Sequence, residues 1–404
     1  MRILQLHNDH ATFGGALEVL TNEGELLREQ GHDVDTYLMP AADTLQLSKV
    51  RASAKAIWNR EVAGIVADRI RAFRPDVVHV HTPFPLMSPS VFRAAAKLRV
   101  PCVATVHSYR YSCIAATCHR DGAICEACVG TVLKLPGVIH RCYHDSVGAS
   151  GALTAGLVLH RTIGTFRDVN RFITLTEFAK QLLVRDGIAA AHVTVKPNFV
   201  PDPGGGHARE PAQPYVAFVG RLVDVKGVQT MLDAWSAGIP GLTLRIAGDG
   251  PLRGLVEERA GADASIEYLG WLEEHEVTEL MAKASCVLVP SEWYEAGVPL
   301  VVLHSLAVGT PVVVSDLENI CADVLRDGTG ASFATGDAAA LADTLRSVLT
   351  DAEGWARRRS AARTAYEERY TPTANAAALL AIYRQVVAED VGRRHAVSRS
   401  SSGA

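Results

Sequence analysis

The chain has 404 residues, more than a single hydrophobic core usually serves, so its length predicts two or three domains. Hydrophobic residues make up 48% and charged residues 21%, as in an ordinary globular protein. The net charge of −4 argues against nucleic-acid binding, which needs a basic surface to hold phosphates. Because no uncharged apolar run reaches the ~18 residues of a membrane span and no apolar leader opens the chain, we expect a cytoplasmic protein with reduced thiols.

Short β-rich runs alternate with helical patterns through the first half of the chain. We expect strands over residues 2–6, 33–39, 76–81, 102–107, 172–175 and 193–196, and helices over residues 15–30, over 49–73 and from residue 88. This alternation predicts a parallel sheet with helices on both faces.

Residues 201–214 contain four prolines and three consecutive glycines without an apolar face, which is typical of a linker. After the linker the strand–helix alternation restarts. The expected domains are an N-terminal Rossmann-like domain (1–200), the linker (201–214), a C-terminal Rossmann-like domain (215–370), a final helix (371–390) that packs back on the N-terminal domain, and a disordered tail (391–404) rich in Arg and Ser.

A glycine pair, Gly14 and Gly15, stands between the first predicted strand and the first long helix. Glycine lets the backbone approach an anion closely, and a helix N-terminus offers free N–H groups and positive potential. The pair is therefore a candidate phosphate site, and a plain tight turn is the alternative.

Arg221 and Lys226 lie five residues apart, in the first turn of the second domain. Together they could clamp a diphosphate, because Arg supplies a planar fork of donors and Lys a point charge. Two solvated charges at a surface turn are the alternative.

Residues 291–300 (SEWYEAGVPL) connect an apolar strand to an apolar helix. Their carboxylates, Glu292 and Glu295, could accept hydrogen bonds from sugar hydroxyls; the alternative is that they only complement the helix dipole. His107 ends a predicted strand, at the edge of the sheet where α/β proteins bind ligands. A structural histidine is the alternative there.

Taken in order, these motifs resemble glycosyltransferase family 4, a large family of retaining enzymes. The resembling stretches are residues 14–16 (GGA), 105–107 (TVH), 219–227 (VGRLVDVKG), 246–251 (IAGDGP), 268–272 (YLGWL) and 290–316 (PSEWYEAGVPLVVLHSLAVGTPVVVSD). The resemblance spans nearly the whole chain. It implies an α/β protein of the GT-B fold, in which two Rossmann-like, doubly wound parallel-sheet domains face each other across a cleft.

The resemblance also implies roles for single residues. Arg221 and Lys226 would neutralise a diphosphate leaving group, His107 would lie beside the transferred sugar, and Glu295 would hold the hydroxyls of that sugar; these four form the expected catalytic set. The expected donor-binding residues are Gly14, Gly15, Gly220, Gly248, Asp249, Trp271, Gly297, Val298, Leu300 and His304. No cofactor is expected for catalysis.

The chain departs from the family pattern in two places. The second family glutamate, which grips the nucleotide ribose, falls on His304, nine residues after Glu295 and one residue later than usual. A neutral imidazole is a weaker hydrogen-bond acceptor than a carboxylate. In addition, Pro299 stands where a backbone N–H donor is often found, and proline has none. Both changes point to an unusual or degenerate donor site.

Five of the eight cysteines fall between residues 113 and 142, inside a segment (108–147) that lacks periodicity. The spacing of Cys113, Cys125, Cys128 and Cys142 is compatible with a tetrahedral structural zinc, which would order this segment. Cys118 is an extra thiol, and a set of free or oxidised thiols is the alternative. A subset of family 4 enzymes resembles this segment, which we expect to border the acceptor side of the cleft.

The implied reaction moves a sugar, with retention, from a nucleotide-diphosphate sugar to a hydroxyl of a sugar or lipid-linked acceptor, in polysaccharide, glycolipid or other glycoconjugate biosynthesis. Two alternatives stay open: a weakly catalytic GT-B-like protein that binds sugar nucleotides, and a GT-B-like epimerase or hydrolase. The mildly apolar residues 151–158 (GALTAGLV) are a candidate for peripheral contact with the inner face of the membrane, with a packed helix as the alternative.

Overall fold

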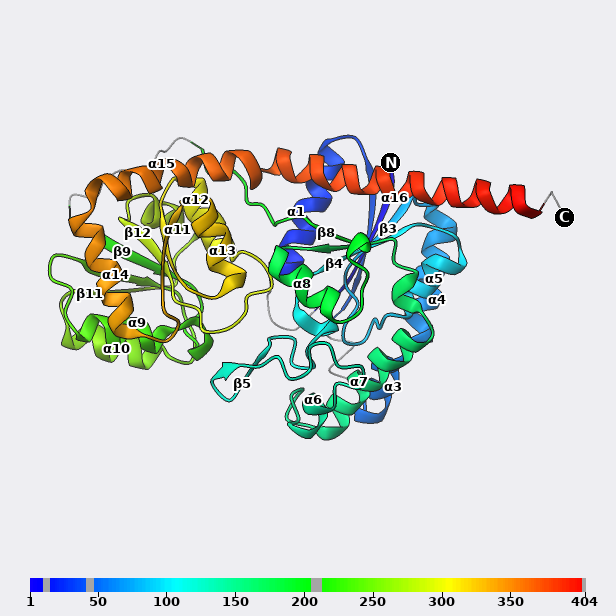
Figure 1. Cartoon of the computed structure of the whole chain (residues 1–404), viewed down its shortest axis with the longest axis horizontal. Coiled ribbons are helices and arrows are strands. Elements are labelled where there is room, and N and C mark those ends of the chain that lie inside the picture. Colours follow the sequence, from blue (N-terminus) through cyan, green and yellow to red (C-terminus); the bar gives the residue numbers. More distant parts are fainter. Residues whose placement is uncertain (10–14, 41–46, 205–212, 402–404) are drawn as a thin grey trace. The chain divides into compact units, whose positions relative to one another are not determined.

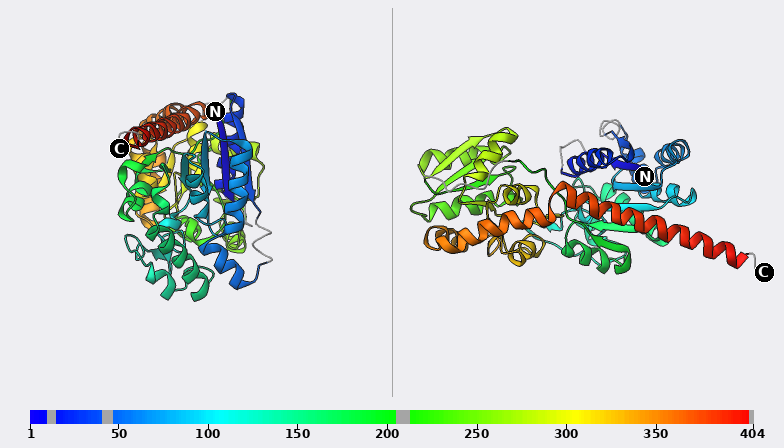
Figure 2. Two further views of the ribbon diagram at one scale, coloured as in Figure 1. Left: turned by 90° about the vertical axis from the view of Figure 1, so that its right-hand side faces the viewer. Right: turned by 90° about the horizontal axis from the view of Figure 1, so that it is seen from above.

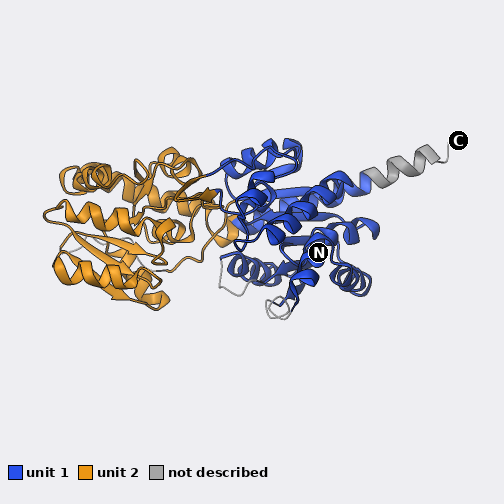
Figure 3. Cartoon of the chain, turned by 90° about the horizontal axis from the view of Figure 1, so that it is seen from below, with its two compact units in different colours: residues 1–118, 125–196, 375–404 blue, residues 119–124, 197–374 orange. Residues whose placement is uncertain are grey.

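The computed structural model describes residues 1–9, 15–40, 47–204 and 213–401, with side chains up to residue 392. The chain divides into two compact units, coloured separately in Figure 3. Unit 1 comprises residues 1–118, 125–196 and 375–404, and unit 2 comprises residues 119–124 and 197–374. Residues 205–212 of the predicted linker lie outside the described residues.

Unit 1 is built on a six-stranded parallel sheet in the order β2-β1-β3-β4-β7-β8 (Figure 1). Its strands are β1 (Arg2–Asn8), β2 (Asp33–Met39), β3 (Val77–Thr82), β4 (Cys102–Val106), β7 (Arg171–Thr174) and β8 (Val193–Val195). The strand order reverses between β1 and β3, because β2 lies on one side of β1 and all later strands lie on the other. Doubly wound sheets bind ligands at such a reversal.

Helices cover both faces of this sheet (Figures 1 and 2). They are α1 (Gly15–Glu29), α3 (Lys49–Ile57), α4 (Arg60–Phe73), α5 (Ser90–Lys97), α7 (Val147–Thr162), α8 (Glu177–Arg185) and α16 (Pro372–Ser401). Side chains of α3, α4, α5 and α7 pack on one face of the sheet. On the other face, Leu379, Tyr383 and Val386 of α16 pack with Leu27 of α1 against the strands.

Two helix predictions in this unit need correction. The single helix predicted over residues 49–73 is two helices, because the chain leaves the helical conformation at Trp58 and Asn59. The side chain of Asn59 accepts a hydrogen bond from the backbone N–H of Val62 and so caps the start of α4. The tail predicted to be disordered continues α16 as far as Ser401, since no proline interrupts that stretch.

The cysteine-rich segment contains only short elements. They are η1 (Tyr109–Tyr111), the two-stranded hairpin of β5 (His119–Arg120) and β6 (Ala123–Ile124), and α6 (Leu135–Ile139). A buried ion pair between Lys134 and Asp186, which follows α8, fastens the segment to the body of unit 1. Lys134 also donates to the backbone carbonyl of Cys128 at 2.8 Å. The remaining short helices of unit 1 are η2 (Thr165–Arg167) and η3 (Ala190–His192).

Unit 2 has its own six-stranded parallel sheet, in the order β11-β10-β9-β12-β13-β14. The strands are β9 (Tyr215–Val219), β10 (Thr243–Ala247), β11 (Ile266–Gly270), β12 (Cys286–Val289), β13 (Val312–Ser315) and β14 (Gly330–Phe333). The helices are η4 (Asp224–Lys226), α9 (Val228–Ser236), α10 (Arg253–Ala262), α11 (Glu274–Ala282), α12 (Leu300–Ala307), α13 (Glu318–Arg326), α14 (Ala338–Thr350) and α15 (Ala352–Arg369). This strand order is that of dinucleotide-binding Rossmann domains.

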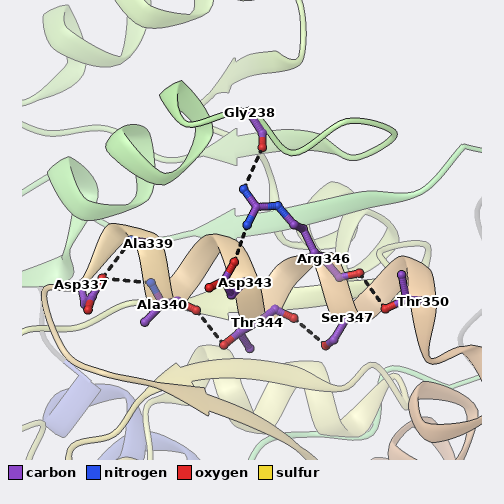
Figure 4. Close-up of polar contacts among 9 residues, drawn as sticks. All are labelled: Gly238, Asp337, Ala339, Ala340, Asp343, Thr344, Arg346, Ser347 and Thr350. Atoms are coloured by element: carbon purple, nitrogen blue, oxygen red, sulfur yellow. Dashed lines mark hydrogen bonds and ion pairs between the residues drawn. The ribbon is translucent and has the colours of Figure 1, made fainter.

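Two hydrophobic cores cover the faces of this second sheet. One is formed with α11, α12, α13 and α15, and the other with α9, α10 and α14. Figure 4 shows how α14 is held in place. Asp337 caps the start of α14 by accepting hydrogen bonds from the backbone of Ala339 and Ala340, and Arg346 donates to the carbonyl of Gly238, beyond α9.

Candidate functional site

The candidate donor site of unit 2 lies where the strand order reverses. Strands β9 and β12 are neighbours at that point, and the chain turns away from each of them at the same edge of the sheet. The loop after β9 contains Arg221 and Lys226, and the loop after β12 contains Ser291 and Glu295. Sheet topology alone therefore brings together two segments that are separated by about 70 residues in the chain.

Glycines let these loops pack tightly. Gly248 has a φ of 141°, and a Cβ atom on it would lie 1.9 Å from the carbonyl oxygen of Gly220. A Cβ on Gly227, whose φ is 68°, would lie 1.9 Å from the carbonyl oxygen of Pro290. Any side chain at either position would displace a neighbouring loop. Gly220 and Gly248, two of the predicted donor-binding residues, therefore approach each other so closely that Gly248 has to be glycine.

An ion pair between Lys226 and Glu295 forms the polar centre of the site. The same carboxylate oxygen, Oε1 of Glu295, accepts hydrogen bonds from Ser291 Oγ and Trp293 Nε1, each at 3.0 Å. Asn319 donates to the backbone carbonyl of Glu295 at 2.8 Å. Both charged side chains are mostly buried, at 20% and 13% exposure, so water screens their interaction less than it would on an open surface. The carboxylate is therefore held in one orientation by three donors.

The other two charged residues of these loops are placed differently. Arg221 is exposed at the start of the loop after β9. Glu292 accepts a hydrogen bond from Thr230 Oγ1 at 2.5 Å, and its backbone N–H bonds to the carbonyl of Val225. Glu292 thus ties the two loops together.

The remaining predicted donor residues surround this centre to different degrees. Gly297 and Val298 are buried in the loop before α12, Leu300 begins that helix, and His304 lies one turn further on. Burial lowers the pKa of His304 below its usual 6.5, so its imidazole is neutral at pH 7. Asp249 is exposed and accepts a hydrogen bond from the N–H of Gly250, and Trp271 is 76% exposed beyond the end of β11.

In unit 1, Gly14 lies outside the described residues, and Gly15 is the first residue of α1. His107 directly follows β4 and is partly exposed. Its Nε2 lies 3.1 Å from Nδ1 of His81 at the end of β3. Burial lowers the pKa of His107 to about 3, so this residue is a neutral hydrogen-bonding group at physiological pH.

Behind His107 lies a buried polar cluster that the sequence analysis missed. It contains Glu23 of α1, His79 and His81 of β3, and Lys196 after β8, all with at most 2% exposure. Lys196 Nζ donates to Glu23 Oε1 at 2.7 Å. The signal for this cluster was the sequence HVH in β3, because alternate residues of a strand face the same side of a sheet.

Within the described residues, no three sulfurs of the cysteines predicted to bind zinc lie within 4.8 Å of one another. Among the described residues, Glu23, His79 and His81 form the only group of three potential ligands whose atoms lie within 4.8 Å of one another. All eight cysteines are reduced thiols, and Cys118 donates a hydrogen bond to the sulfur of Cys113, which lowers the pKa of Cys113 to about 5. The zinc centre and its alternative, a set of thiols without a metal, therefore both stay predictions.

Within the described ranges, no helix combines the length and the apolar character needed to cross a bilayer.

Two family models match the chain. The one described as "Glycosyltransferase Family 4" matches residues 13–202, and the one described as "Glycosyl transferases group 1" matches residues 213–351. The glycogen synthase of Mycobacterium tuberculosis is 28% identical over 299 residues, which are 72% of this chain and 64% of the relative. The chain thus spans just under two thirds of the length of that relative.

Two further proteins are similar. The GDP-mannose-dependent alpha-(1-6)-phosphatidylinositol dimannoside mannosyltransferase of the same species is 34% identical over 180 residues, which are 43% of this chain and 45% of the relative. The crystal structure of Anabaena Alr3699/HepE in complex with UDP has a TM-score of 0.66 with 16% identity, and covers 95% of this chain and 100% of its own. The chain therefore has the GT-B fold and consists of a Glycosyltransferase Family 4 domain followed by a group 1 glycosyl transferase domain.

Proposed function

We propose that this protein is a retaining glycosyltransferase that moves a sugar from a nucleotide-diphosphate sugar to a hydroxyl group of an acceptor. The observation that carries the proposal is the ion pair of Lys226 and Glu295 at the strand reversal of unit 2, with Arg221 exposed in the same loop. A diphosphate needs cations, and a sugar needs fixed hydrogen-bond acceptors. These loops offer both at one edge of the sheet.

The names of similar proteins support the donor class. The mycobacterial mannosyltransferase is named as GDP-mannose-dependent, and the Anabaena protein was crystallised with UDP. Both donor types carry a diphosphate, which is the part that Arg221 and Lys226 would bind. The nucleotide base differs between these two proteins, so the proposal is limited to the class of nucleotide-diphosphate sugars.

In the proposed reaction, the bond between the anomeric carbon and the diphosphate oxygen breaks, and its electron pair leaves with the diphosphate. Arg221 and Lys226 stabilise the negative charge that develops on this leaving group. The acceptor hydroxyl attacks the same face of the sugar and passes its proton to a departing phosphate oxygen, which retains the anomeric configuration. Glu295 holds hydroxyls of the transferred sugar, and His107 lies beside that sugar.

We further propose that the acceptor is a sugar or lipid-linked sugar of glycoconjugate biosynthesis, that the enzyme works in the cytoplasm, and that it needs no cofactor for catalysis. Peripheral contact with the inner face of a membrane belongs to the same proposal. The predicted contact region, residues 151–158, lies within α7, whose residues Leu153 and Leu157 are buried in the core of unit 1. A membrane contact would therefore use other residues of this helix or of its surroundings.

A panel of nucleotide sugars tests the function directly. Thermal shift should show that one or more donors raise the melting temperature, because a ligand that binds only the native state stabilises it. The donors that bind are then incubated with the protein and candidate acceptors. A weak binding protein would bind a donor without turnover, and an epimerase or hydrolase would consume the donor without an acceptor. Either result would replace the transferase assignment.

A further inference from the structure

The polar cluster behind His107 forms a chain of neighbouring polar groups from α1 to the edge of the sheet, in which only the step from Glu23 to His81 exceeds hydrogen-bond distance. Lys196 Nζ lies 2.7 Å from Glu23 Oε1, Glu23 Oε2 lies 3.6 Å from His81 Nε2, and His81 Nδ1 lies 3.1 Å from His107 Nε2. Glu23 and His81 are fully buried, whereas His107 is partly exposed. The chain therefore connects a buried carboxylate to a histidine that a ligand can reach.

Charges in this cluster are fixed by their surroundings. Burial is the largest single effect on the pKa of Glu23 and raises it, but Lys196, His79 and His107 together lower it further, so the net pKa is below 4.5 and the carboxylate is ionised. Burial lowers the pKa of His81 well below 6.5. His7, His107 and Lys196 also face His81, and a positive charge on any of them opposes its protonation. His81 and His107 are consequently both neutral.

Neutral histidines carry one proton each, and the contacts determine where it lies. Oε2 of the ionised Glu23 lies 3.6 Å from Nε2 of His81, beyond hydrogen-bond distance, but its negative charge favours the proton of His81 on that nitrogen. Nδ1 of His81 is then an acceptor, and the hydrogen bond at 3.1 Å requires a proton on Nε2 of His107. The two rings are nearly parallel, at 14°, with their centroids 5.2 Å apart. Nδ1 of His107 is left without a proton.

We infer that Glu23 and His81 are positioning residues that fix His107 as the tautomer with a bare Nδ1, so that His107 accepts a hydrogen bond from a hydroxyl group of the substrate. The inference deepens the proposed function and rests on it for the identity of the ligand. Because the pKa of His107 is about 3, its Nδ1 acts as a hydrogen-bond acceptor rather than as a base that removes the proton. The ligand group must therefore be a donor, as a sugar hydroxyl is.

A metal centre formed by Glu23, His79 and His81 would be the other use of this cluster, since their potential ligand atoms lie within 4.8 Å of one another. Existing bonds oppose it. Both ring nitrogens of His79 are engaged, with Tyr383 Oη at 2.7 Å and Thr105 Oγ1 at 2.8 Å. The ammonium of Lys196 already balances the charge of Glu23. A divalent cation would have to break these contacts and lie beside a positive charge.

Nitrogen NMR of the full-length protein with ¹⁵N-labelled histidine rings tests the inference without a substrate, with the His107 signals assigned from a His107→Gln variant. The expected spectrum has a protonated Nε2 and an unprotonated Nδ1 for His107 near pH 7. The opposite tautomer would overturn the inference. If the expected tautomer is found but no nucleotide sugar is turned over, the proposed function fails while the tautomer assignment stands.

Variants of His81 test the coupling. His81→Leu removes the acceptor, so the tautomer of His107 should become mixed and turnover should fall ~10–100-fold, as is typical when the outer partner of a functional histidine is lost. His81→Asn keeps an acceptor oxygen near the position of Nδ1 and should restore most of both properties. An unchanged His107 tautomer in His81→Leu would refute the coupling. If His81→Leu does not fold, His81→Asn still tests the coupling. The wild-type tautomer of His107 in this variant would support the coupling, and the opposite tautomer would contradict it.

His79 provides the matched control, because it is a buried histidine two residues away on the same strand. Its nitrogens bond to Tyr383 and Thr105, so it lies outside the chain from Glu23 to His107. His79→Asn should lower stability and leave the His107 tautomer unchanged. If it alters the tautomer as strongly as His81→Leu does, the effect is one of general packing and the inference is wrong.

Discussion

Lys226 and Glu295 form an ion pair although 69 positions separate them in the chain. Each follows a different central strand of unit 2, and the parallel pairing of β9 with β12 places both at one edge of the sheet. The pair is mostly buried and is surrounded by further donors to the carboxylate, so neither side chain can rotate into solvent without losing these contacts. A donor diphosphate and its sugar would meet a cation and an anion that are already oriented.

The two cations should matter for turnover. Replacing Arg221 or Lys226 with Ala should lower kcat ~10²–10³-fold each, by analogy with the loss of one donor to developing negative charge. Lys283→Ala is the matched control, because Lys283 also pairs with a glutamate, Glu279, but on the exposed surface of α11. Steady-state kinetics with the best donor measure the effect. A near-normal kcat in both site variants would show that neither Arg221 nor Lys226 stabilises the leaving group.

The two glutamates of the loop after β12, Glu292 and Glu295, should differ in their contribution to catalysis. Glu295→Gln removes the charge that holds Lys226 and, in the proposed function, the acceptor for sugar hydroxyls, so kcat/KM for the donor should fall about tenfold or more. Glu292→Gln should have little effect on catalysis, because the carboxylate of Glu292 bonds to Thr230 between the loops. Equal losses in the two variants would indicate that both residues act only through loop structure.

The sheets and the motif-bearing loops of the fold could be predicted from the sequence, since alternating strands and helices dictate them. From the sequence, Arg221, Lys226 and Glu295 were predicted to lie on loops that follow strands. In the structure these loops lie at the same edge of one sheet. Residues recruited by side-chain contact were missed. Trp293 and Ser291 donate to Glu295 because of the local conformation of their loop, and the sequence has no hydrophobic periodicity that predicts such contacts.

The sequence also did not show which polar residues are buried or held by contacts with distant parts of the chain. In the sequence, Glu23 is an ordinary charged residue of an amphipathic helix. Its burial is explained by its ion pair with Lys196, which directly follows β8. The break between α3 and α4 was missed for a related reason. Asn59 is held in place by bonds to Leu86 and Ser88, residues from a distant loop.

Glycine 248 allows a sharp test of loop packing. Gly248→Ala should destabilise the protein by several kcal/mol or disorder the donor loops, because the new Cβ would lie 1.9 Å from the carbonyl oxygen of Gly220 and φ is 141°. Gly254→Ala is the control: Gly254 lies in α10, and a Cβ added there would have no atom within 4 Å, so the change should be neutral or stabilise by up to about 1 kcal/mol. Urea denaturation measures both. A tolerated Gly248→Ala would show that the loops separate easily.

Metal analysis tests the zinc prediction. If the centre predicted for Cys113, Cys125, Cys128 and Cys142 forms, protein purified without chelator should contain one zinc per chain, and EDTA should lower its melting temperature. In that case Cys142→Ser should destabilise the protein and release the metal, whereas Cys286→Ser, in the core of unit 2, should not release it. Substoichiometric zinc and an unchanged melting temperature would support the alternative, a set of thiols without a metal.

Stability should fall as the pH falls from 6.5 to 4, and His160 supplies a measurable part of that change. His160 is fully buried in α7, where its Nε2 bonds to the carbonyl of Ile57 and its Nδ1 to Thr165, each at 3.0 Å. Burial lowers its pKa to about 4. In this pH window the unfolded chain binds a proton that the folded chain does not bind, so the free energy of unfolding decreases with decreasing pH, by roughly 3 kcal/mol at pH 4 for this one group.

His160→Gln removes the titrating group and keeps a donor for the carbonyl of Ile57. The variant should be less stable than the wild type at pH 7.5, because the bond to Thr165 and the stacking on Trp58 are weakened. Its stability should, however, depend less steeply on pH between 6.5 and 4, by about one proton. Urea denaturation of both proteins at several pH values measures the slope. The difference in stability at pH 7.5 measures the loss of packing alone. If the free energy of unfolding depends equally steeply on pH in the two proteins, His160 is protonated as readily in the folded state as in the unfolded chain.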